Sequence, residues 1–368
     1  MNESPLFVMA GGGTGGHVIP AIAVAREVLK MGYRVLFVGT ERGVESRLVP
    51  AAGLRLEKIR VGGIKNLSFM TRLVSLWQLI AETVSQVLNF GQWKPAAVFS
   101  MGGYVAGPPV LAALLRGVPV ILMEPNAVPG FTNRYISRWV TRALINFKET
   151  ASYFPEGRTE VTGLPVREEF FSVPRKTEGE FTVLITGGSQ GSRRLNEAAQ
   201  QSWPLFREAG LPVRSIHQTG TAMYESIAAS FRESGLAGEI APFISDMAAA
   251  FARADLAVGR AGAGAVSELA AAGKPSVLIP FPFAADQHQL KNAEAFERAG
   301  AARMCLDRDW NGQRFFEAVH DLYQDRARLD AMGECARKLA HPGAARRAAE
   351  ILVGSALTDP TAVETIRD

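Results

Sequence analysis

Cysteine is scarce in this sequence. Its 368 residues include 2 cysteines, Cys305 and Cys335, which stand in separate contexts without metal-ligand spacing. We therefore expect no disulfide framework, and a reducing cytoplasm fits this composition.

Long apolar runs are also missing. A membrane-spanning helix needs roughly 20 consecutive apolar residues, and no stretch reaches that length. The apolar run at residues 6–10 is too short for the apolar part of a secretory signal. We expect the chain to remain on the side of the membrane where it is made.

Charge is nearly balanced overall but uneven along the chain. The net charge is +4, yet residues 1–150 contain 16 Lys and Arg against 8 Asp and Glu, so the remainder is acidic. A basic N-terminal half suits a membrane surface, a nucleic acid or a phosphorylated substrate. Nucleic acid is the weakest of these, because neither zinc-finger spacing nor an aromatic RNA-binding signature occurs.

The chain is long enough for two domains, and its 36 glycines cluster. Short apolar runs alternate with helical segments in both halves, which predicts an α/β fold with two doubly wound parallel sheets. We expect domains at 1–164 and 165–343, an irregular linker near 154–180, and a last helix at 344–357 that returns to the first domain. The expected strands are 6–10, 33–39, 96–100, 118–123 and 143–147, then 181–186, 213–217, 239–243, 256–258 and 276–279.

The first glycine cluster, residues 11–17, follows a predicted strand and precedes a helix expected at 18–31. Such a loop presents backbone N–H groups to phosphate at the positive end of the helix. The loop satisfies the dinucleotide pattern G-x-G-x-x-G, and Glu41 could serve as the acidic residue of that pattern. A nicotinamide-dependent oxidoreductase is therefore one alternative, although it leaves His17 and the later glycine loops unexplained.

Further glycine loops follow strands in both halves. Residues 187–192 open the second half as 11–17 open the first, and the pair at 102–103 follows another strand. The small residues of 259–268 precede a helix that carries Glu268, whose carboxylate could accept both hydroxyls of a ribose. Asp286, Gln289 and Asn292 stand at i, i+3 and i+6, where they could share one helix face and bind sugar hydroxyls. Each motif also has a purely structural interpretation. The glycine loops could be turns without ligands, Glu268 a charge stabilised at a helix end, and the last three residues a solvated polar face.

Several motifs together resemble the MurG family of bacterial glycosyltransferases, which add N-acetylglucosamine to undecaprenyl-pyrophosphoryl-muramoyl-pentapeptide (lipid I) to form lipid II. The resemblance extends from about residue 6 to about residue 350. The motifs are Gly-Gly-Thr-Gly-Gly-His (12–17), Met-Gly-Gly-Tyr (101–104), Asn-Ala-Val-Pro-Gly (126–130), Gly-Gly-Ser-Gln-Gly-Ser (187–192), Ala-Val-Ser-Glu (265–268) and Asp-Gln-His-Gln-Leu-Lys-Asn-Ala (286–293).

This resemblance implies a GT-B fold, with two Rossmann-like domains and a cleft between them. It implies that Arg167 and Ile244 hold the uracil of UDP-N-acetylglucosamine, Ser189 the diphosphate, Glu268 the ribose, and Gln289 with Asn292 the sugar. The further implied donor contacts are Thr14, Gly15, Gly16, Asn126, Ala263, Gly264, Ala265, Val266 and Ser267. The implied acceptor contacts are Gly13, Gly102, Gly103 and Tyr104. Two positions depart from the family pattern, with Pro125 in place of a glutamine and Leu164 in place of an asparagine.

The resemblance also implies inversion at the donor carbon by a single displacement. His17 is the candidate general base, because imidazole titrates near neutrality; the alternative is that it hydrogen-bonds the loop or the acceptor phosphate. We expect no metal and no cofactor, and we expect helix N-termini to stabilise the leaving diphosphate.

The implied partners are UDP-N-acetylglucosamine, lipid I, the anionic inner leaflet of the cell membrane, and other cell-wall and division proteins. The segment 67–88 could bind that leaflet peripherally, since Phe69, Leu73, Trp77 and Ile80 lie on an apolar stripe with basic residues nearby. An ordinary amphipathic helix facing the core is the alternative. Other interpretations of the whole chain are a transferase acting on diacylglycerol, a UDP-N-acetylglucosamine epimerase, and a nucleotide-sugar sensor without turnover.

Overall fold

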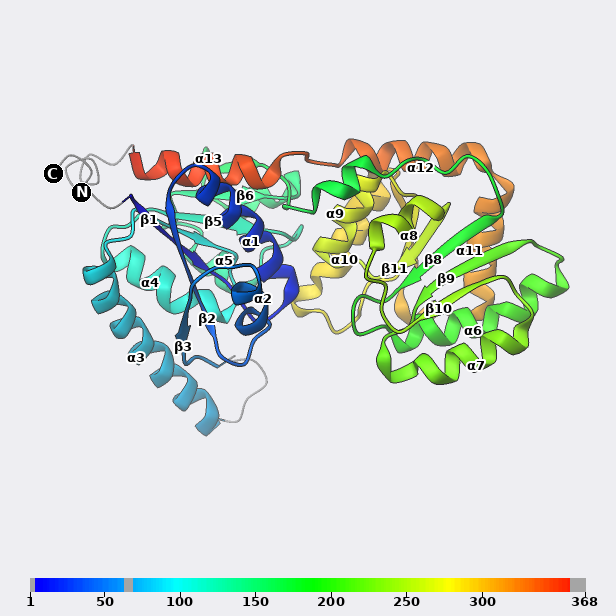
Figure 1. The fold of residues 1–368 in the computed structure, drawn as a ribbon, viewed down its shortest axis with the longest axis horizontal. Helices are drawn as coiled ribbons and strands as arrows, with labels where there is room; N and C mark the ends of the chain where they lie inside the picture. Colours follow the sequence, from blue (N-terminus) through cyan, green and yellow to red (C-terminus); the bar gives the residue numbers. More distant parts are fainter. Residues whose placement is uncertain (1–3, 63–68, 358–368) are drawn as a thin grey trace. The chain divides into compact units, whose positions relative to one another are not determined.

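The computed structural model describes residues 4–62 and 69–357, without the side chains of residues 69–73. The chain forms two α/β units. Unit 1 consists of Met1–Val166 with Gly343–Asp368, and unit 2 consists of Arg167–Pro342. Each unit contains its own parallel sheet (Figure 1) and its own buried core.

Unit 1 alternates strands with helices, as the apolar pattern predicts. Its strands are β1 (Leu6–Ala10), β2 (Arg34–Thr40), β3 (Leu56–Ile59), β4 (Ala97–Ser100), β5 (Val120–Glu124), β6 (Arg142–Ile145) and β7 (Thr159–Val161). Its helices are α1 (Gly15–Lys30), α2 (Glu45–Ala51), α3 (Phe69–Trp93), η1 (Tyr104–Ala106), α4 (Gly107–Leu115), α5 (Phe131–Ile136), η2 (Lys148–Tyr153) and α13 (Ala344–Leu357).

The strands of unit 1 form one parallel sheet in the order β3-β2-β1-β4-β5-β6-β7. All strands are parallel, but β2 and β3 are added on one side of β1 and β4 to β7 on the other, so the strand order reverses between β1 and β4. In open parallel sheets, ligands bind beyond the carboxyl ends of the strands at such a reversal point. The loops after β1 and β4 therefore mark the place in unit 1 where a site is expected.

Unit 1 differs from the sequence-based expectation at the start of its first helix and at two strands that were not expected, β3 and β7. Helix α1 begins at Gly15, three residues before the expected start, so Gly15, Gly16 and His17 form its first turn. The expected irregular linker contains β7, which pairs in parallel with β6 and extends the sheet. Three residues are enough for an edge strand, but they are too few to give a periodic apolar signal.

Helix α13 follows unit 2 in sequence but belongs to unit 1. It packs against α1, and Leu352 and Ala348 on its buried face are fully inaccessible to solvent. An ion pair of 2.7 Å between Arg347 Nε and Glu160 Oε1 adds a polar contact with the end of unit 1. Unit 1 is therefore completed only after the whole of unit 2 has been synthesised.

Unit 2 has the same layered plan. Its strands are β8 (Phe181–Thr186), β9 (Val213–Gln218), β10 (Gly238–Ala241), β11 (Leu256–Gly259), β12 (Ser276–Leu278) and β13 (Ala302–Met304). Its helices are η3 (Glu168–Ser172), α6 (Arg193–Glu208), η4 (Thr221–Met223), α7 (Tyr224–Ser234), α8 (Met247–Arg253), α9 (Ala263–Ala272), η5 (Ala285–Gln287), α10 (His288–Arg298), η6 (Asp307–Asp309), α11 (Gly312–Gln324) and α12 (Arg326–Lys338).

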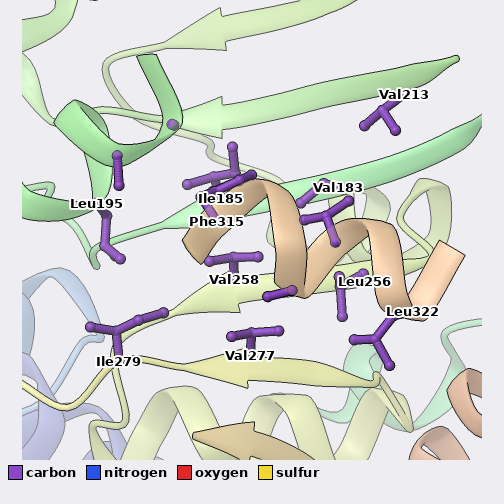
Figure 2. Close-up of a cluster of buried hydrophobic side chains, with 14 of the residues drawn as sticks. Val183, Ile185, Leu195, Val213, Leu256, Val258, Val277, Ile279, Phe315 and Leu322 are labelled. Atoms are coloured by element: carbon purple, nitrogen blue, oxygen red, sulfur yellow. The ribbon is translucent and has the colours of Figure 1, made fainter. Parts of the chain in front are cut away.

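The parallel sheet of unit 2 has the order β10-β9-β8-β11-β12-β13, so its reversal point lies between β8 and β11. Figure 2 shows the core on one face of this sheet, where Phe315 and Leu322 of α11 pack over branched side chains of β8, β11 and β12. These strands are buried, which explains their continuous apolar sequences. The core fixes the sheet and thereby the loops at its carboxyl edge.

Candidate active site

The loops at the reversal point of unit 1 bring the predicted acceptor residues together. A side-chain carbon built at Gly13 would lie 3.5 Å from Cε1 of Tyr104, and one built at Gly103 would lie 3.6 Å from Nδ1 of His17. Gly102 and Gly103 have φ of +77° and +75°, a conformation that other residues rarely adopt. The two loops thus form one surface of small residues with an imidazole and a phenol beside it.

A buried carboxylate supports the first glycine loop from within. Glu45 accepts hydrogen bonds from Gly13 N at 2.8 Å, Thr40 N at 2.9 Å and Thr40 Oγ1 at 2.6 Å. Glu41, the acidic residue considered for a dinucleotide, is instead exposed and pairs with Lys58. A pyrophosphate bound at Gly13 N would meet the Glu45 carboxylate, so the geometry disfavours a nicotinamide cofactor. Gly13 can therefore serve an acceptor through its small size, not through its N–H.

His17 lies in the first turn of α1 and is half-buried. Its Nδ1 is 3.3 Å from the carbonyl oxygen of Gly12. When Nδ1–H donates to that oxygen, the basic lone pair of the ring is on Nε2. Thr14 and Gly16 are exposed and Gly15 is half-exposed, so the predicted donor contacts of unit 1 are accessible.

Asn126 is held by a second buried carboxylate. Glu124 accepts hydrogen bonds from Asn126 N at 2.9 Å, Asn126 Nδ2 at 3.2 Å, Gly130 N at 3.1 Å and Asn133 Nδ2 at 2.7 Å. Burial raises the pKa of Glu124, although these hydrogen bonds act in the opposite direction. The amide of Asn126, a predicted donor contact, is thus fixed in orientation by a carboxylate that was not among the predicted site residues.

The two positions that depart from the family pattern meet at one side chain. Asn146 Nδ2 donates to the carbonyl oxygen of Pro125 at 3.1 Å, and Asn146 Oδ1 accepts from Leu164 N at 3.0 Å. Both contacts use the backbone of the departing residue. Proline and leucine therefore keep this link between the loop after β5 and the segment after β7.

In unit 2, the loop at 187–192 lies at the carboxyl end of β8. Ser189 at its tip is exposed, and Gly191 N donates to the carbonyl oxygen of Gly188 at 2.9 Å. A side-chain carbon at Gly191 would lie 1.9 Å from the carbonyl oxygen of Thr219, so the loop rests directly on the backbone after β9. This packing requires glycine and leaves the Ser189 side exposed to solvent.

A hollow of about 690 Å³ adjoins this loop within unit 2. Its basic side chains are Arg193, Arg194 and Arg260, and Phe283, which is highly exposed, contributes to its apolar wall. Arg260 was not among the predicted site residues, although it stands in the Gly-Arg-Ala-Gly cluster. Its guanidinium donates to Ser192 Oγ at 2.8 Å and thereby links the reversal-point loops after β8 and β11. Each arginine also pairs with an acid of the same hollow, Arg193 with Glu197 and the other two with Asp307, so a diphosphate bound there would compete with these carboxylates for the guanidinium groups.

Helix α9 begins at the other side of the reversal point. Ala263, Gly264 and Ala265 in its first turn are half-exposed, and a side-chain carbon at Gly264 would have no neighbour within 4 Å. Val266 and Ser267 are buried, so they face the unit's interior in this structure. The exposed first turn offers N–H groups and the positive end of the helix dipole to an anionic ligand.

Glu268 follows on α9 in an unusual electrostatic setting. Burial raises its pKa to about 7, while Arg167 acts to lower that pKa and Glu169 to raise it further. Arg167 pairs with Glu169 at 2.8 Å and covers the ring of Phe170. Ile244, the other predicted uracil contact, is half-exposed in the segment between β10 and α8.

The predicted sugar-binding residues divide into two groups. Gln289 lines the hollow, and its Oε1 accepts from Phe281 N at 3.0 Å. Asn292 is completely buried and its Nδ2 donates to the carbonyl oxygen of Ala261, so it supports the loop after β11. Asp286 precedes α10 and has a φ of +51°, so the expectation that it shares a helix face with the other two is wrong.

The predicted membrane stripe lies on α3. Phe69 and Leu73 fall outside the described side chains, but Trp77 and Ile80 are exposed, and they continue into a surface with Val74, Leu76, Val84 and Leu88. The opposite, buried face of α3 carries the polar residues Ser75, Thr83 and Gln86. The helix is therefore apolar toward solvent, contrary to the alternative in which the stripe faces the core.

Two parallel α/β units in one chain, each with a glycine loop at its reversal point, define the GT-B class of glycosyltransferases. The glycosyltransferase family 28 N-terminal domain matches residues 7–145, and the glycosyltransferase family 28 C-terminal domain matches residues 182–348. The chain belongs to glycosyltransferase family 28.

The curated relatives and solved structures agree with this assignment. A UDP-N-acetylglucosamine--N-acetylmuramyl-(pentapeptide) pyrophosphoryl-undecaprenol N-acetylglucosamine transferase of Solibacter usitatus is 59% identical over 94% of this chain and 95% of the relative. The protein of the same name from Myxococcus xanthus is 39% identical, over 94% and 92%. The crystal structure of Acinetobacter baumannii MurG has a TM-score of 0.81 at 33% identity, covering 95% of this chain and 99% of that one.

Proposed function

We propose that this enzyme transfers N-acetylglucosamine from UDP-N-acetylglucosamine to lipid I, forming lipid II for peptidoglycan synthesis. The observation that carries the proposal is the 59% identity, over nearly the whole of both chains, to a curated transferase whose name states this donor group and this acceptor. The exposed loops at the reversal points of both units supply chemically suitable surfaces for a nucleotide sugar and a pyrophosphoryl lipid.

The donor belongs on unit 2 in this proposal. Ser189 and the first turn of α9 face the diphosphate with hydroxyl and N–H groups. Arg260, which pairs with Asp307, lies beside the same loop through its hydrogen bond to Ser192. Glu268 accepts the ribose hydroxyls, and Gln289 binds the sugar at the hollow. Arg167 and Ile244 hold the uracil.

The acceptor and the proton transfer belong on unit 1. The acceptor hydroxyl attacks C1 of the donor sugar, the bond from C1 to the UDP oxygen breaks, and His17 Nε2 takes the hydroxyl proton. Gly102, Gly103 and Tyr104 line the place where the acceptor pyrophosphate binds. UDP leaves as the anion, and its charge is stabilised by the N–H groups at the first turn of α9.

The lipid acceptor requires the enzyme to work at a membrane surface. Within the described ranges, no helix is both long and apolar enough to cross a bilayer. We assign peripheral binding at the cytoplasmic face to the outer side of α3, where Trp77 is 72% exposed while Gln86 on the inner side is 1% exposed. Exposed apolar side chains on a basic domain favour the interface of an anionic leaflet.

The activity is tested by transfer of labelled N-acetylglucosamine from UDP to a short-chain lipid I analogue, with a chelator present. Label in the lipid product supports the proposal, including activity without added metal. Donor binding without transfer would point to another acceptor or to a sensor, and failure to bind UDP-N-acetylglucosamine would contradict the donor assignment. His17→Ala should lower kcat about 100-fold or more if His17 is the base.

Membrane binding is tested with the double variant Trp77→Ser/Ile80→Ser. We expect at least a ten-fold loss of binding to anionic liposomes with unchanged affinity for UDP, because two exposed apolar side chains are removed and neither belongs to a loop assigned to the nucleotide. The control variant Leu29→Ser/Val161→Ser changes two exposed apolar residues of unit 1 outside α3. Equal liposome binding by both variants and the wild type would contradict the assignment of this face.

A further inference from the structure

A buried glutamine connects two parts of the proposed donor site. Gln218 is the last residue of β9 and is 2% exposed. Its Nε2 donates to the carbonyl oxygen of Gly188 at 2.9 Å and to Thr186 Oγ1 at 3.2 Å. Its Oε1 accepts from Ile244 N at 2.7 Å. The amide nitrogen of Gln218 thus binds the glycine loop after β8, and its amide oxygen binds the segment after β10.

These segments lie at opposite ends of the proposed nucleotide. Gly188 precedes Ser189 in the loop assigned to the diphosphate, whereas Ile244 is assigned to the uracil. We propose that Gln218 is a positioning residue that fixes the spacing between the diphosphate loop and the uracil segment and thereby sets the affinity for UDP. This inference rests on the donor assignment given above, and Gln218 itself touches neither the sugar nor the acceptor in that assignment.

The chemistry of the site requires an amide. The Gly188 carbonyl oxygen needs a donor and Ile244 N needs an acceptor, and a primary amide supplies both within one rigid plane. The Thr186 hydroxyl oxygen also accepts from Gly188 N at 3.2 Å, so the same cluster holds both polar groups of the Gly188 backbone. A carboxylate could still accept from Ile244 N, but it would place an oxygen against the Gly188 carbonyl oxygen.

The packing beneath the loop makes this link rigid. Gly191 and Gly220 lie so close to the opposing backbone that added side-chain carbons would be 1.9 Å from the carbonyl oxygen of Thr219 and 2.1 Å from that of Gln190. The glycine loop and the residues that follow Gln218 are therefore in direct backbone contact. A shift of the backbone at Gln218 should therefore also shift the glycine loop, because no side chain lies between them that could rearrange.

Gln218→Glu tests the inference, with Gln200→Glu as the matched control. Gln200 is a glutamine of the same unit whose Nε2 donates to Ser230 Oγ, away from the glycine loop. We expect Gln218→Glu to weaken UDP binding, measured by calorimetry, and to raise KM for UDP-N-acetylglucosamine, each about ten-fold. The kcat at saturating donor should change less than about two-fold, because the reacting groups are untouched. The control should retain both affinities.

Each outcome decides the question. A folded Gln218→Glu enzyme with unchanged UDP affinity overturns the inference, as does a fall in kcat with unchanged KM, which indicates only a loss of active protein. If this variant does not fold, Thr186→Val removes one of the three contacts without adding charge, and it should still weaken UDP binding several-fold. Failure of the wild type to bind UDP would instead reject the donor assignment.

Discussion

At the scale of single residues, the two buried carboxylates of unit 1 hold the shape of two loops by accepting hydrogen bonds. Glu45 and Glu124 each accept several N–H groups from a loop that carries predicted site residues. Burial raises the pKa of both, but at Glu45 the hydrogen bonds from Thr40 and Gly13 outweigh burial and the pKa is lowered. Each carboxylate satisfies loop donors that would otherwise be left buried without a partner.

Glu268 gives a pH prediction for donor binding. Its pKa is raised to about 7, mainly by burial, and only the ionised carboxylate can accept both ribose hydroxyls. The protonated form dominates below pH 7, so the affinity for UDP should increase as pH rises from 6 to 8. Titrations of UDP across this range check the prediction, and Glu268→Gln should bind weakly with little pH dependence.

A neighbouring carboxylate provides the control for that assignment. Glu169 raises the pKa of Glu268, so Glu169→Gln should lower it and move the midpoint of the affinity profile to lower pH. Because Glu169 also pairs with Arg167, the affinity at high pH must be compared as well. A profile whose midpoint does not move would show that another group controls the pH dependence.

At the scale of elements, the sequence predicts most strands within two residues and both glycine loops at strand ends. Strands have strong signals because parallel sheets bury continuous apolar runs. The orientation of α3 was not predictable, because an apolar stripe has the same spacing whether it faces a core or a membrane. The residues that hold the loops in place were also not predictable from the sequence. Glu45 resembles an ordinary acid in a helical first turn, and Gln218 resembles an ordinary strand residue.

The glycines of the two donor loops should respond differently to substitution. Gly264 has open space around it, so Gly264→Val should leave the melting temperature nearly unchanged but obstruct the exposed first turn of α9. We expect KM for the donor to rise at least ten-fold. Gly191→Ala forces a carbon onto the Thr219 carbonyl oxygen and should destabilise the fold itself. Normal donor kinetics of Gly264→Val would remove α9 from the nucleotide site.

At the scale of the whole molecule, each unit has a separate core while the chain passes through unit 1 twice. The core of unit 2 includes Leu322 of α11, whereas unit 1 depends on Leu352 of α13, which comes after unit 2 in sequence. Both side chains are completely buried. The donor assignment places UDP mainly on unit 2. Core mutations and UDP binding should therefore show which unfolding transition belongs to which unit.

Calorimetric unfolding of matched core variants tests this division. Leu352→Ala should destabilise unit 1 by about 2–5 kcal/mol and lower one transition, and Leu322→Ala should lower the other by a similar amount. UDP at about 100 times its Kd should stabilise the unit that binds it by about 2.7 kcal/mol. We expect UDP to raise the transition that Leu322→Ala lowers and to have less effect on the one that Leu352→Ala lowers. If UDP instead raises only the transition sensitive to Leu352→Ala, the nucleotide binds unit 1 and the assignment of donor and acceptor must be exchanged.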